Sequence, residues 1–450
     1  MHIMLIINAT VTTWGDRPAI LRDHALYIED GVIKAMGPTA SLQSQYDEAE
    51  TLDARGQLVM PGNICAHTHF YGAYARGMAI PGAPPPDFPT ILKRLWWGLD
   101  RALDRDAVYA SAMVCLVDAI KHGTTTLIDH HASPNAIDRS LDIIANAVSR
   151  AGLRAVLCYE VSDRDGEASI RDGIAENVRF IETTGQRRRI AALFGLHASM
   201  TLSDATLRAC RDAAPEGTGF HIHVAEHEAD QEDSLQKYGR RVVQRLHDHG
   251  ILGERTIAAH CVHIDQSELK LLRETNTWVT HQPRSNMNNG VGAMAFDRMY
   301  RGGIRLCLGN DGFSNNMWAE WKTAYLLHKV AQRDPRAANG ADLARVAVDN
   351  NARLIETFFP GMRFGEITPG AAADLIFVDY QPFTPLSAGN LPWHILFGFE
   401  ASMITTTIVD GVVLMRDRQL TNLDEQAIME QARELAPAVW ERYQAIVAGE

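Results

Sequence analysis

The chain has 450 residues, with 43 Lys and Arg against 55 Asp and Glu, a formal net charge of −12, and is 46% hydrophobic and 22% charged. These ordinary globular values exclude disordered, collagen-like and coiled-coil chains, and the acidic balance disfavours nucleic acid and anionic membranes as partners. Six scattered cysteines form no disulfide framework, no apolar run is long enough for a membrane span, and the N-terminus lacks a basic signal region. We therefore expect a cytoplasmic protein. The count of 18 histidines is the unusual figure.

The first 60 residues predict short β-strands. β-Branched runs alternate with glycine and Asp-Gly turns in MLIINATVTTW, ALYIEDGVIKAMG and QLVMPG. This pattern is typical of antiparallel strands joined by tight turns.

The middle of the chain, residues 61–363, alternates short apolar runs with longer helical stretches. Counting LVMPGNICAHTH as the first, eight strand candidates lie between residues 58 and 312. The others are TTTLIDHH, RAVLCYEVSD, IAALFGLHASM, GFHIHVAE, TIAAHCVHI, TWVTHQPRSN and IRLCLGNDG. Eight strand–helix repeats predict an α/β fold, a (β/α)8 TIM barrel.

An irregular, proline-rich stretch, RGMAIPGAPPPDFPTILKRLWWGLD, follows the first of these strands. In a barrel it lies over the C-terminal face, where residues 77–90 form either a lid or a plain surface insertion. Trp96 and Trp97 either stack on a bound ring or pack under a helix, and aromatic pairs more often do the latter.

Residues 364–420 return to the pattern of the first 60, in GEITPGAAADLIFVDY and ITTTIVDGVVLMRD. We expect residues 1–60 and 364–420 to form one composite β-domain, a small β-sandwich built from both termini. Residues 421–450 predict a C-terminal helix.

Imidazoles and carboxylates collect at the ends of the predicted barrel strands. Period-two alternation directs His67 and His69 of the first strand to one side. The fifth strand holds His223 and Glu226, and the eighth ends at Asp311. Such a set predicts a divalent transition-metal site with open positions for water, whose pKa the metal lowers. Two core histidines bonded to carbonyls would explain the first pair alone, but not all these positions together.

Five further histidines lie at or near strand ends, where a role in the core is at least as plausible as a catalytic one. They are His130, His131, His221, His263 and His281.

The motifs PGNICAHTH, HVAEHEAD, AAHCVHID, HQPRSN, LGNDGFS and GEITPGAAADL resemble those of the amidohydrolase superfamily, in its metal-dependent deaminase and chlorohydrolase branch. The resemblance spans nearly the whole chain. DHHASPNAI, CYEVSDRDGE, RSNMNNGVG and GNDGFSNN are especially similar to the SsnA-type aminohydrolases, which are associated with the catabolism of purines and other nitrogen heterocycles.

The resemblance implies metal ligands at His67, His69, His223 and Asp311. Glu226 matches the proton shuttle, His260 matches the histidine that hydrogen-bonds the attacking hydroxide or the reacting atom, and Asp311 takes part in catalysis as well as binding metal. Binuclear relatives need a lysine on strand four. IAALFGLHASM contains none, so we expect one divalent ion per subunit, Zn²⁺ or Fe²⁺.

Five residues are candidates for substrate binding. His197 and Arg284 match positions that face the substrate in relatives. His130, Glu160 and Asn286 follow predicted strands and offer the polar groups that suit a heterocycle with amide-like edges.

The implied activity is deamination of a nitrogen heterocycle, such as a purine, a pterin or a related ring, by attack of metal-bound hydroxide. The same residues suit hydrolysis of a ring amide, or displacement of chloride or an alkylamine, because the metal does not record the leaving group. A remote alternative is an inactive scaffold, although every matched position is filled. The expected partner is a small heterocyclic molecule. Relatives of this architecture are often homo-oligomers, so a dimer or larger assembly is expected.

Overall fold

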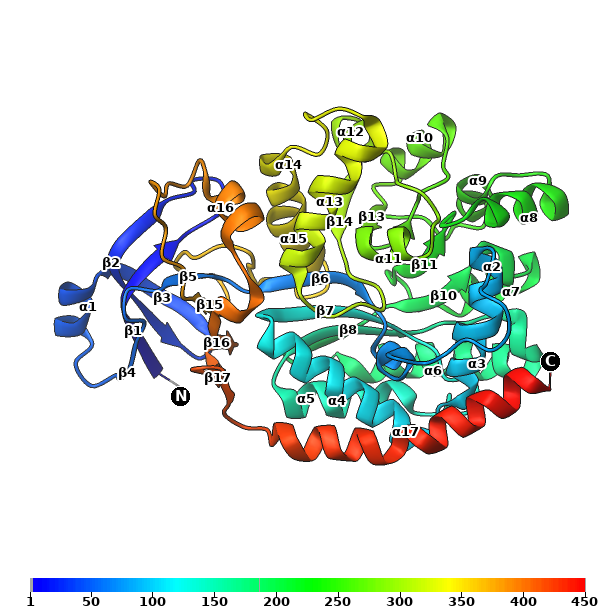
Figure 1. Cartoon of the computed structure of the whole chain (residues 1–450), viewed down its shortest axis with the longest axis horizontal. Helices are drawn as coiled ribbons and strands as arrows, with labels where there is room; N and C mark the ends of the chain where they lie inside the picture. Colours follow the sequence, from blue (N-terminus) through cyan, green and yellow to red (C-terminus); the bar gives the residue numbers. More distant parts are fainter. Residues whose placement is uncertain (1–2, 186, 450) are drawn as a thin grey trace.

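The computed structural model describes residues 3–185 and 187–449. Two groups of elements divide the molecule (Figure 1): a sheet built from both ends of the chain, and a larger body of strands and helices from its middle. Within the described ranges, none of the helices is both long and apolar enough to cross a membrane.

Two parallel sheets form the centre of the larger body. One contains β6 (Asn63–Thr68), β7 (Thr124–His131), β8 (Arg154–Tyr159) and β9 (Ile190–Ala192). The other contains β10 (Phe194–Ala198), β11 (Phe220–Val224), β12 (Ile257–His260), β13 (Trp278–His281) and β14 (Arg305–Leu308). Isolated parallel bridges link the two sheets, from Thr68 to Asp311 and from Val161 to Leu196.

These strands are the ones that the sequence predicts. β7 is buried along its whole length, as expected of a parallel strand covered on both faces. The first predicted strand is divided. β5 (Leu58–Pro61) joins the terminal sheet and β6 the central one. Between them, the chain passes so close to Thr125 that a Cβ at Gly62 would lie 2.2 Å from its methyl carbon.

Helices connect and surround the parallel strands. They are α4 (Arg105–Lys121), α5 (Ser140–Ala151), α6 (Gly166–Thr184), α7 (Asp204–Ala213), α8 (Glu228–Tyr238), α9 (Val242–Asp248), α10 (Gln266–Glu274), α11 (Pro283–Asn288), α12 (Phe296–Arg301), α13 (Met317–Gln332), α14 (Gly340–Ala344) and α15 (Asn351–Glu356). Side-chain caps define several of their starts; Asp265 and Glu268 form a capping box on α10.

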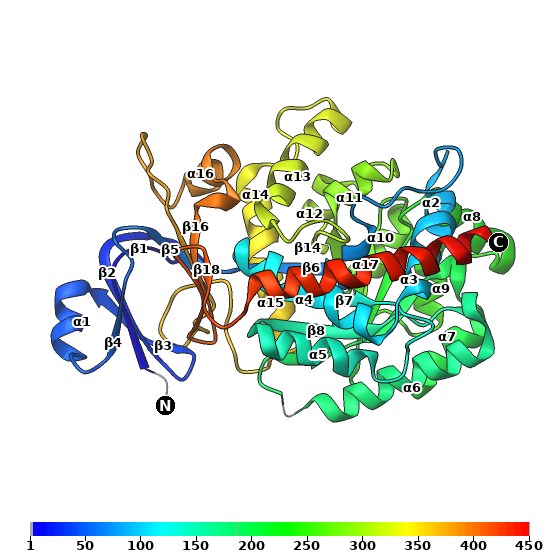
Figure 2. The same cartoon turned by 60° about the horizontal axis from the view of Figure 1, so that its bottom comes forward.

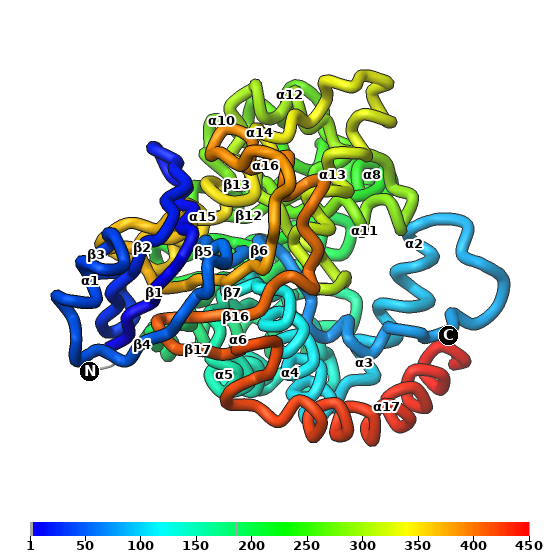
Figure 3. Tube along the Cα trace, turned by 60° about the vertical axis from the view of Figure 1, so that its left-hand side comes forward, coloured from blue at the N-terminus to red at the C-terminus, as the bar shows by residue number. Residues whose placement is uncertain are grey.

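A nine-stranded sheet joins the two ends of the chain (Figure 3). Its strands are β1 (Ile3–Thr12), β2 (Ile20–Glu29), β3 (Val32–Pro38), β4 (Glu50–Asp53), β5, β15 (Leu375–Val378), β16 (Ile404–Val409), β17 (Val412–Arg416) and β18 (Gln419–Leu420). β5 connects the halves, because it pairs with β1 on one side and β15 on the other. Two helices accompany the sheet, α1 (Thr39–Gln45) and α16 (Leu391–Gly398).

The segment after β6 forms an irregular cover. It contains the 3-10 turn η1 (Phe70–Ala75), α2 (Phe88–Ile91), a π-helical turn at Leu92–Trp96 and α3 (Trp97–Ala102). The C-terminal helix α17 (Glu425–Ala448) runs along α4 and α3 (Figure 2). It therefore braces this cover from outside.

Candidate functional site

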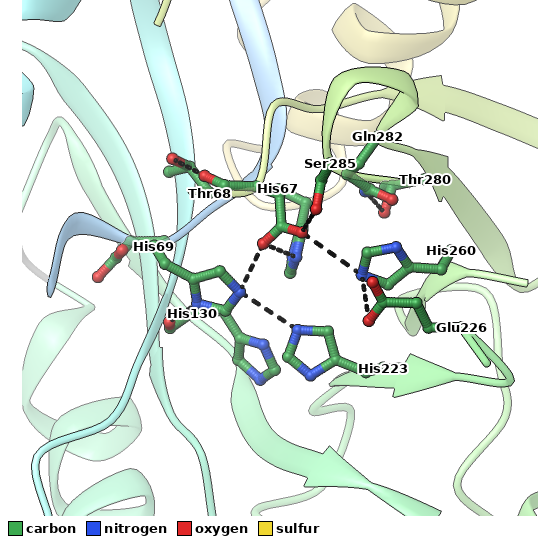
Figure 4. A network of polar contacts seen from close by, with 12 residues as sticks. His67, Thr68, His69, His130, His223, Glu226, His260, Thr280, Gln282 and Ser285 are labelled. Atoms are coloured by element: carbon green, nitrogen blue, oxygen red, sulfur yellow. Dashed lines mark hydrogen bonds and ion pairs between the residues drawn. The ribbon is translucent and has the colours of Figure 1, made fainter. Parts of the chain in front are cut away.

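Four predicted ligand residues converge where the central strands end (Figure 4). His67 lies on β6 and His69 directly after it, His223 lies on β11, and Asp311 follows β14. Oδ1 of Asp311 lies 3.0 Å from Nε2 of His69 and 3.6 Å from Nε2 of His67. The Nε2 atoms of His69 and His223 are 3.2 Å apart. The structure therefore brings all four side chains together.

Backbone carbonyls set the tautomers of His69 and His223. Nδ1 of His69 donates to the carbonyl oxygen of His130 at 2.5 Å, and Nδ1 of His223 donates to that of His197 at 2.8 Å. Because a carbonyl oxygen only accepts, each Nδ1 carries the ring proton and each Nε2 presents a lone pair. Two lone pairs 3.2 Å apart repel each other unless a proton or a cation lies between them.

His67 adds a third nitrogen. Its Nδ1 lies 2.8 Å from Nε2 of His221, whereas its own Nε2 is buried without a hydrogen-bond partner. Three imidazole nitrogens and the carboxylate of Asp311 form a donor set that suits Zn²⁺ or Fe²⁺. The residues present therefore fit a divalent cation.

Burial and neighbouring charge act differently on the two carboxyl groups of the site. Burial raises the pKa of Glu226 well above its usual value, and the nearby charge of Asp311 adds to this rise. Burial also opposes ionisation of Asp311, but the adjacent imidazoles of His67 and His69 hold its pKa well below the usual value. The environment thus shifts the pKa values of the two carboxyl groups in opposite directions, and such a pair divides acid and base roles.

His260 lies between these carboxyl groups. Its Nε2 is 3.5 Å from Oε2 of Glu226 and 3.8 Å from Oδ2 of Asp311. Nδ2 of Asn286 lies 2.8 Å from His260 Nδ1. An amide nitrogen only donates, so Nδ1 accepts and the ring proton is on Nε2. Burial also lowers the pKa of His260 well below its usual value, which keeps the ring neutral. His260 therefore acts as a hydrogen-bond donor toward the centre of the site.

Two polar residues bridge the carboxyl groups: Ser285 of α11, and Asn289, which caps the end of this helix. Oγ of Ser285 donates to Oδ2 of Asp311 at 2.5 Å. Nδ2 of Asn289 donates to Oε1 of Glu226 at 3.4 Å and to Oγ of Ser285 at 3.3 Å. The sequence analysis did not single out Asn289. Its spacing from Ser285 could have indicated it, because Asn289 follows Ser285 by four residues at the end of a helix that begins at Pro283. This spacing places both residues on one face.

The backbone is strained at three strand ends of the site. Ala225, His260 and Asp311 have φ angles of 45°, 72° and 59°, in the left-handed region that non-glycine residues rarely adopt. Hydrogen bonds hold two of them: the Ala225 amide donates to Asp230 at 2.9 Å, and the Asp311 amide donates to the carbonyl of His67 at 3.0 Å. Strain of this kind gathers at functional sites.

A cavity of about 610 Å³, named here the central cavity, opens above these residues. Its floor includes His69, His223, Glu226 and Asp311, and His197 also lines it. Its apolar wall comes from the cover segment and the β10 end, with Tyr71, Phe88, Leu92, Leu95, Trp96, Trp97 and Met200. Residues Gly77, Phe88 and Pro89 of the 77–90 loop line it, as do both tryptophans.

Four of the five predicted substrate-binding residues lie away from the surface of this cavity. Arg284 is held by Glu320 at 2.5 Å and by the carbonyl of Ser314 at 2.7 Å. Asn286 contacts His260 as described. His130 and Glu160 are buried beneath the ligand histidines, where Nδ1 of His130 lies 3.5 Å from Oε1 of Glu160.

The histidines whose roles the sequence left open all have protein neighbours. His221 pairs with His67, and His130 stacks on His221 with ring centroids 4.2 Å apart. His281 lies outside the site, with its Nε2 3.0 Å from that of His328. His131 contacts a serine hydroxyl, and His263 contacts a backbone carbonyl.

Known proteins resemble this chain along most of its length. The model of the amidohydrolase family matches residues 58–414. The chain is 31% identical over 443 residues to the 5′-deoxyadenosine deaminase of Methanosarcina mazei, covering 97% of this chain and 98% of that protein. It is 32% identical over 446 residues to the 5-methylthioadenosine/S-adenosylhomocysteine deaminase of Pelotomaculum thermopropionicum, covering 97% and 98%.

Among solved structures, an adenosine deaminase from Xanthomonas campestris with bound zinc superposes with a TM-score of 0.86, at 24% identity over 97% of this chain and 98% of that one. At this identity the likeness concerns the fold, which is of the TIM-barrel type.

Proposed function

Because this chain belongs to the amidohydrolase family, as its motifs predict, and hydrolyses a carbon–nitrogen bond of a cyclic compound, we propose that its substrate is an adenosine derivative altered at the 5′ carbon. The exocyclic amino group at C6 of the adenine ring leaves as ammonia. The observation that carries the reaction type is the convergence of Glu226, His69, His223 and Asp311 on the floor of one cavity, where His67, His69, His223 and Asp311 could hold a cation. The two relatives aligned over 97% of the chain support the substrate class.

The central cavity supports a nucleoside rather than a bare ring. Its volume of about 610 Å³ exceeds what a free base fills, and its wall carries two indole rings. Beside them Oδ1 of Asp100 and Nε1 of Trp97 are buried without a hydrogen-bond partner. These atoms offer an acceptor and a donor for sugar hydroxyl groups.

We propose His67, His69, His223 and Asp311 as ligands of one divalent ion per subunit, Zn²⁺ or Fe²⁺. When bound, such an ion lowers the pKa of a water molecule toward neutral pH. The Asp311 carboxylate takes a proton from the attacking water. His260 donates a hydrogen bond from Nε2 toward the oxygen that adds to C6. The two groups thus remove a proton and orient the oxygen.

Glu226 supplies the opposite proton movement. Its protonated carboxyl group transfers a proton to the ring nitrogen beside C6 as the C–O bond forms. The carboxylate then passes the second proton of the water to the amino group, the C6–N bond breaks, and ammonia and a carbonyl product leave. The proton held by Asp311 then returns to Glu226, which restores both groups. Asn289 holds Oε1 of Glu226, which leaves Oε2 directed toward His260.

The remaining assignments are proposals on the same basis. His197 contacts substrate directly, and Arg284, His130, Glu160 and Asn286 act on substrate through the residues that they contact. The bridges at Thr68 and Val161 support closure of the two parallel sheets into one eight-stranded barrel, with β9 and β10 as one interrupted strand.

We also propose the domain division that the sequence suggests: a composite β-domain of residues 1–60 and 364–420, a barrel of 61–363 and the helix within 421–450. Shared strand pairing of β5 with β1 and β15 supports the composite domain. A cytoplasmic homo-oligomer remains the proposed state of the protein.

The test is ammonia release from protein of measured metal content. The substrates are 5′-deoxyadenosine, 5-methylthioadenosine, adenosine, guanine, a pterin and a ring amide, with chloride release from a chlorotriazine assayed in parallel. We expect the highest kcat/KM for the two 5′-altered nucleosides. Turnover of another ring without any turnover of adenosine derivatives would overturn the substrate class, and chloride release alone would favour the halide-displacing alternative.

A further inference from the structure

A buried carboxylate, Glu160, lies behind the cation site and moves no proton in the proposed reaction. It follows β8, is 3% exposed, and lies next to three imidazoles. Oε1 lies 3.3 Å from Nδ1 of His69 and 3.5 Å from Nδ1 of His130, and Oε2 lies 3.8 Å from Nε2 of His197. Oε1 has no hydrogen-bond partner, because the His69 proton is donated to a backbone carbonyl.

A carboxylate in this position needs a compensating positive charge, since burial of an unpaired charge is costly. In the ranges that the structure describes, no Lys or Arg forms an ion pair with Glu160. The neighbouring guanidinium of Arg164 binds Asp100 instead, at 3.0 Å. Without a cation, the neighbouring imidazoles provide this charge: against the effect of burial, Asp311 and Glu160 raise the pKa of His69 well above its usual value. Against the same effect, the histidines lower the pKa of Glu160 to about 2. A divalent cation at Nε2 of His69 would take the place of this proton.

We propose that Glu160 is a positioning residue for the divalent cation: it lies against the Nδ1 edge of His69, whose Nε2 faces the cation, and supplies the second negative charge that a divalent ion needs here. The inference rests on the metal-dependent function proposed above. A carboxylate beside the Nδ1–H of a ligand imidazole makes Nε2 a better donor and holds the ring in place.

The charge count supports this role. Three neutral imidazoles and the Asp311 carboxylate would leave a divalent ion with one uncompensated positive charge in a buried site. Burial, together with the charge of Asp311, disfavours a further negative charge on Glu226. Glu160 removes the surplus, so the loaded site becomes neutral, and in return the cation compensates the carboxylate.

The test compares Glu160→Gln with Glu160→Asp, which keeps the charge, and with Glu160→Met, which removes it without leaving a buried amide. Glu176→Gln is the matched control. Glu176 is equally buried at 3% but is bound to Arg179 and to the amides at the start of α5, away from the site. The Zn²⁺ dissociation constant is measured by competition with a chelating dye, and the Tm is measured with and without Zn²⁺.

We expect Glu160→Gln and Glu160→Met to weaken Zn²⁺ binding about 10-fold or more. Their metal-free Tm should fall modestly, because the neighbouring imidazoles stabilise the Glu160 carboxylate. The rise in Tm on adding Zn²⁺ should shrink, because the cation binds more weakly. Glu160→Asp should bind Zn²⁺ nearly as the wild type does. Glu176→Gln should lower Tm equally with and without Zn²⁺ and keep the affinity.

Two results distinguish a failure of the proposed role of Glu160 from a failure of the proposed metal-dependent function. Wild-type affinity in a folded Glu160→Gln or Glu160→Met variant would overturn the role of Glu160 and leave the proposed function standing. A wild-type protein that binds no divalent cation would overturn the metal-dependent function itself.

Discussion

The Nδ2 atom of Asn286 lies 2.8 Å from Nδ1 of His260, and this contact determines which ring nitrogen of the histidine carries the proton. With Nδ1 accepting, Nε2 points its proton toward Glu226 and Asp311. The base of the proposed reaction is then Asp311, and His260 orients the attacking oxygen.

Replacing Asn286 by Asp tests this tautomer assignment. A carboxylate would accept from Nδ1–H and move the ring proton away from Nε2, so kcat should fall about 100-fold, the size of one lost catalytic hydrogen bond in a preorganised site. In Asn286→Ala the His260 ring loses this contact but its tautomer is not reversed, so kcat should fall less than in Asn286→Asp. Ammonia release measures both, and metal content should stay at the wild-type level. Equal activity of Asn286→Asp and the wild type would contradict the assignment.

Removing the acid of Glu226 should abolish turnover while sparing the cation. In Glu226→Gln the side chain keeps its shape and its contact with Asn289, but it cannot transfer a proton. We expect kcat to fall by about 10²- to 10⁴-fold, the usual contribution of a general acid–base group. Steady-state kinetics on protein with measured metal content is the check. Near-wild-type rates would show that another group moves the proton.

Metal removal should inactivate the enzyme reversibly. Dialysis against a chelator is expected to remove activity, and Zn²⁺ or Fe²⁺ to restore it, because hydroxide at neutral pH depends on the cation. His223→Ala should lower the metal content of the purified protein. His263→Asn is the control, since the His263 ring bonds to the carbonyl of Val291 at 2.7 Å and does not face the site. Elemental analysis distinguishes the two variants.

The C-terminal helix α17 should hold the cover segment, and with it the apolar wall of the central cavity, in the position that binds substrate. Tyr443 donates to the carbonyl of Arg94 at 2.5 Å, and Trp440 donates to that of Tyr74 at 3.0 Å. Tyr443→Ala removes one of these ties to the cover and its packing against Gly98. We expect KM to rise several-fold with a smaller change in kcat, measured with 5′-deoxyadenosine. A fall in kcat at constant KM would instead place the effect on the catalytic residues.

A buried ion pair connects the central body to the terminal sheet, and breaking it should lower the free energy of unfolding. Arg154 on β8 contacts Asp374 at 3.1 Å and lies over the rings of Phe359 and Phe364. Asp374→Asn leaves the guanidinium without its partner charge and should cost about 3–5 kcal/mol of unfolding free energy. Urea unfolding measures the loss. The double variant with Arg154→Met should recover part of it, because no unpaired charge remains.

Much of the architecture and the ligand set could be predicted from local patterns. Alternation along a strand has a period of two, so His67 and His69 had to share a side, and strand-length apolar runs separated by helices indicated the parallel sheets. The division of the first strand at Gly62 was not predictable in this way. The chain there passes close to Thr125, which belongs to a different strand.

Reasoning from local patterns could not predict where the side chains of the substrate-binding candidates point. Arg284, Glu160 and Asn286 were chosen because they follow strands, but a position after a strand does not specify the direction of a side chain. Glu320 holds Arg284, and the ligand histidines cover Glu160. Asn289 belongs to the site through its contact with Glu226, a residue 63 positions away.

The sequence by itself thus indicated the family and the reaction class, because its motifs resemble those of a known family. It also predicted which groups could act as donors, because the spacing of histidines and carboxylates along strands is a local property of the chain. Only the tertiary structure decided the pKa shifts of Glu226 and Asp311, the tautomer of His260 and the place of Glu160. These depend on burial and on charges brought together from distant segments, and neither quantity exists until the chain has folded.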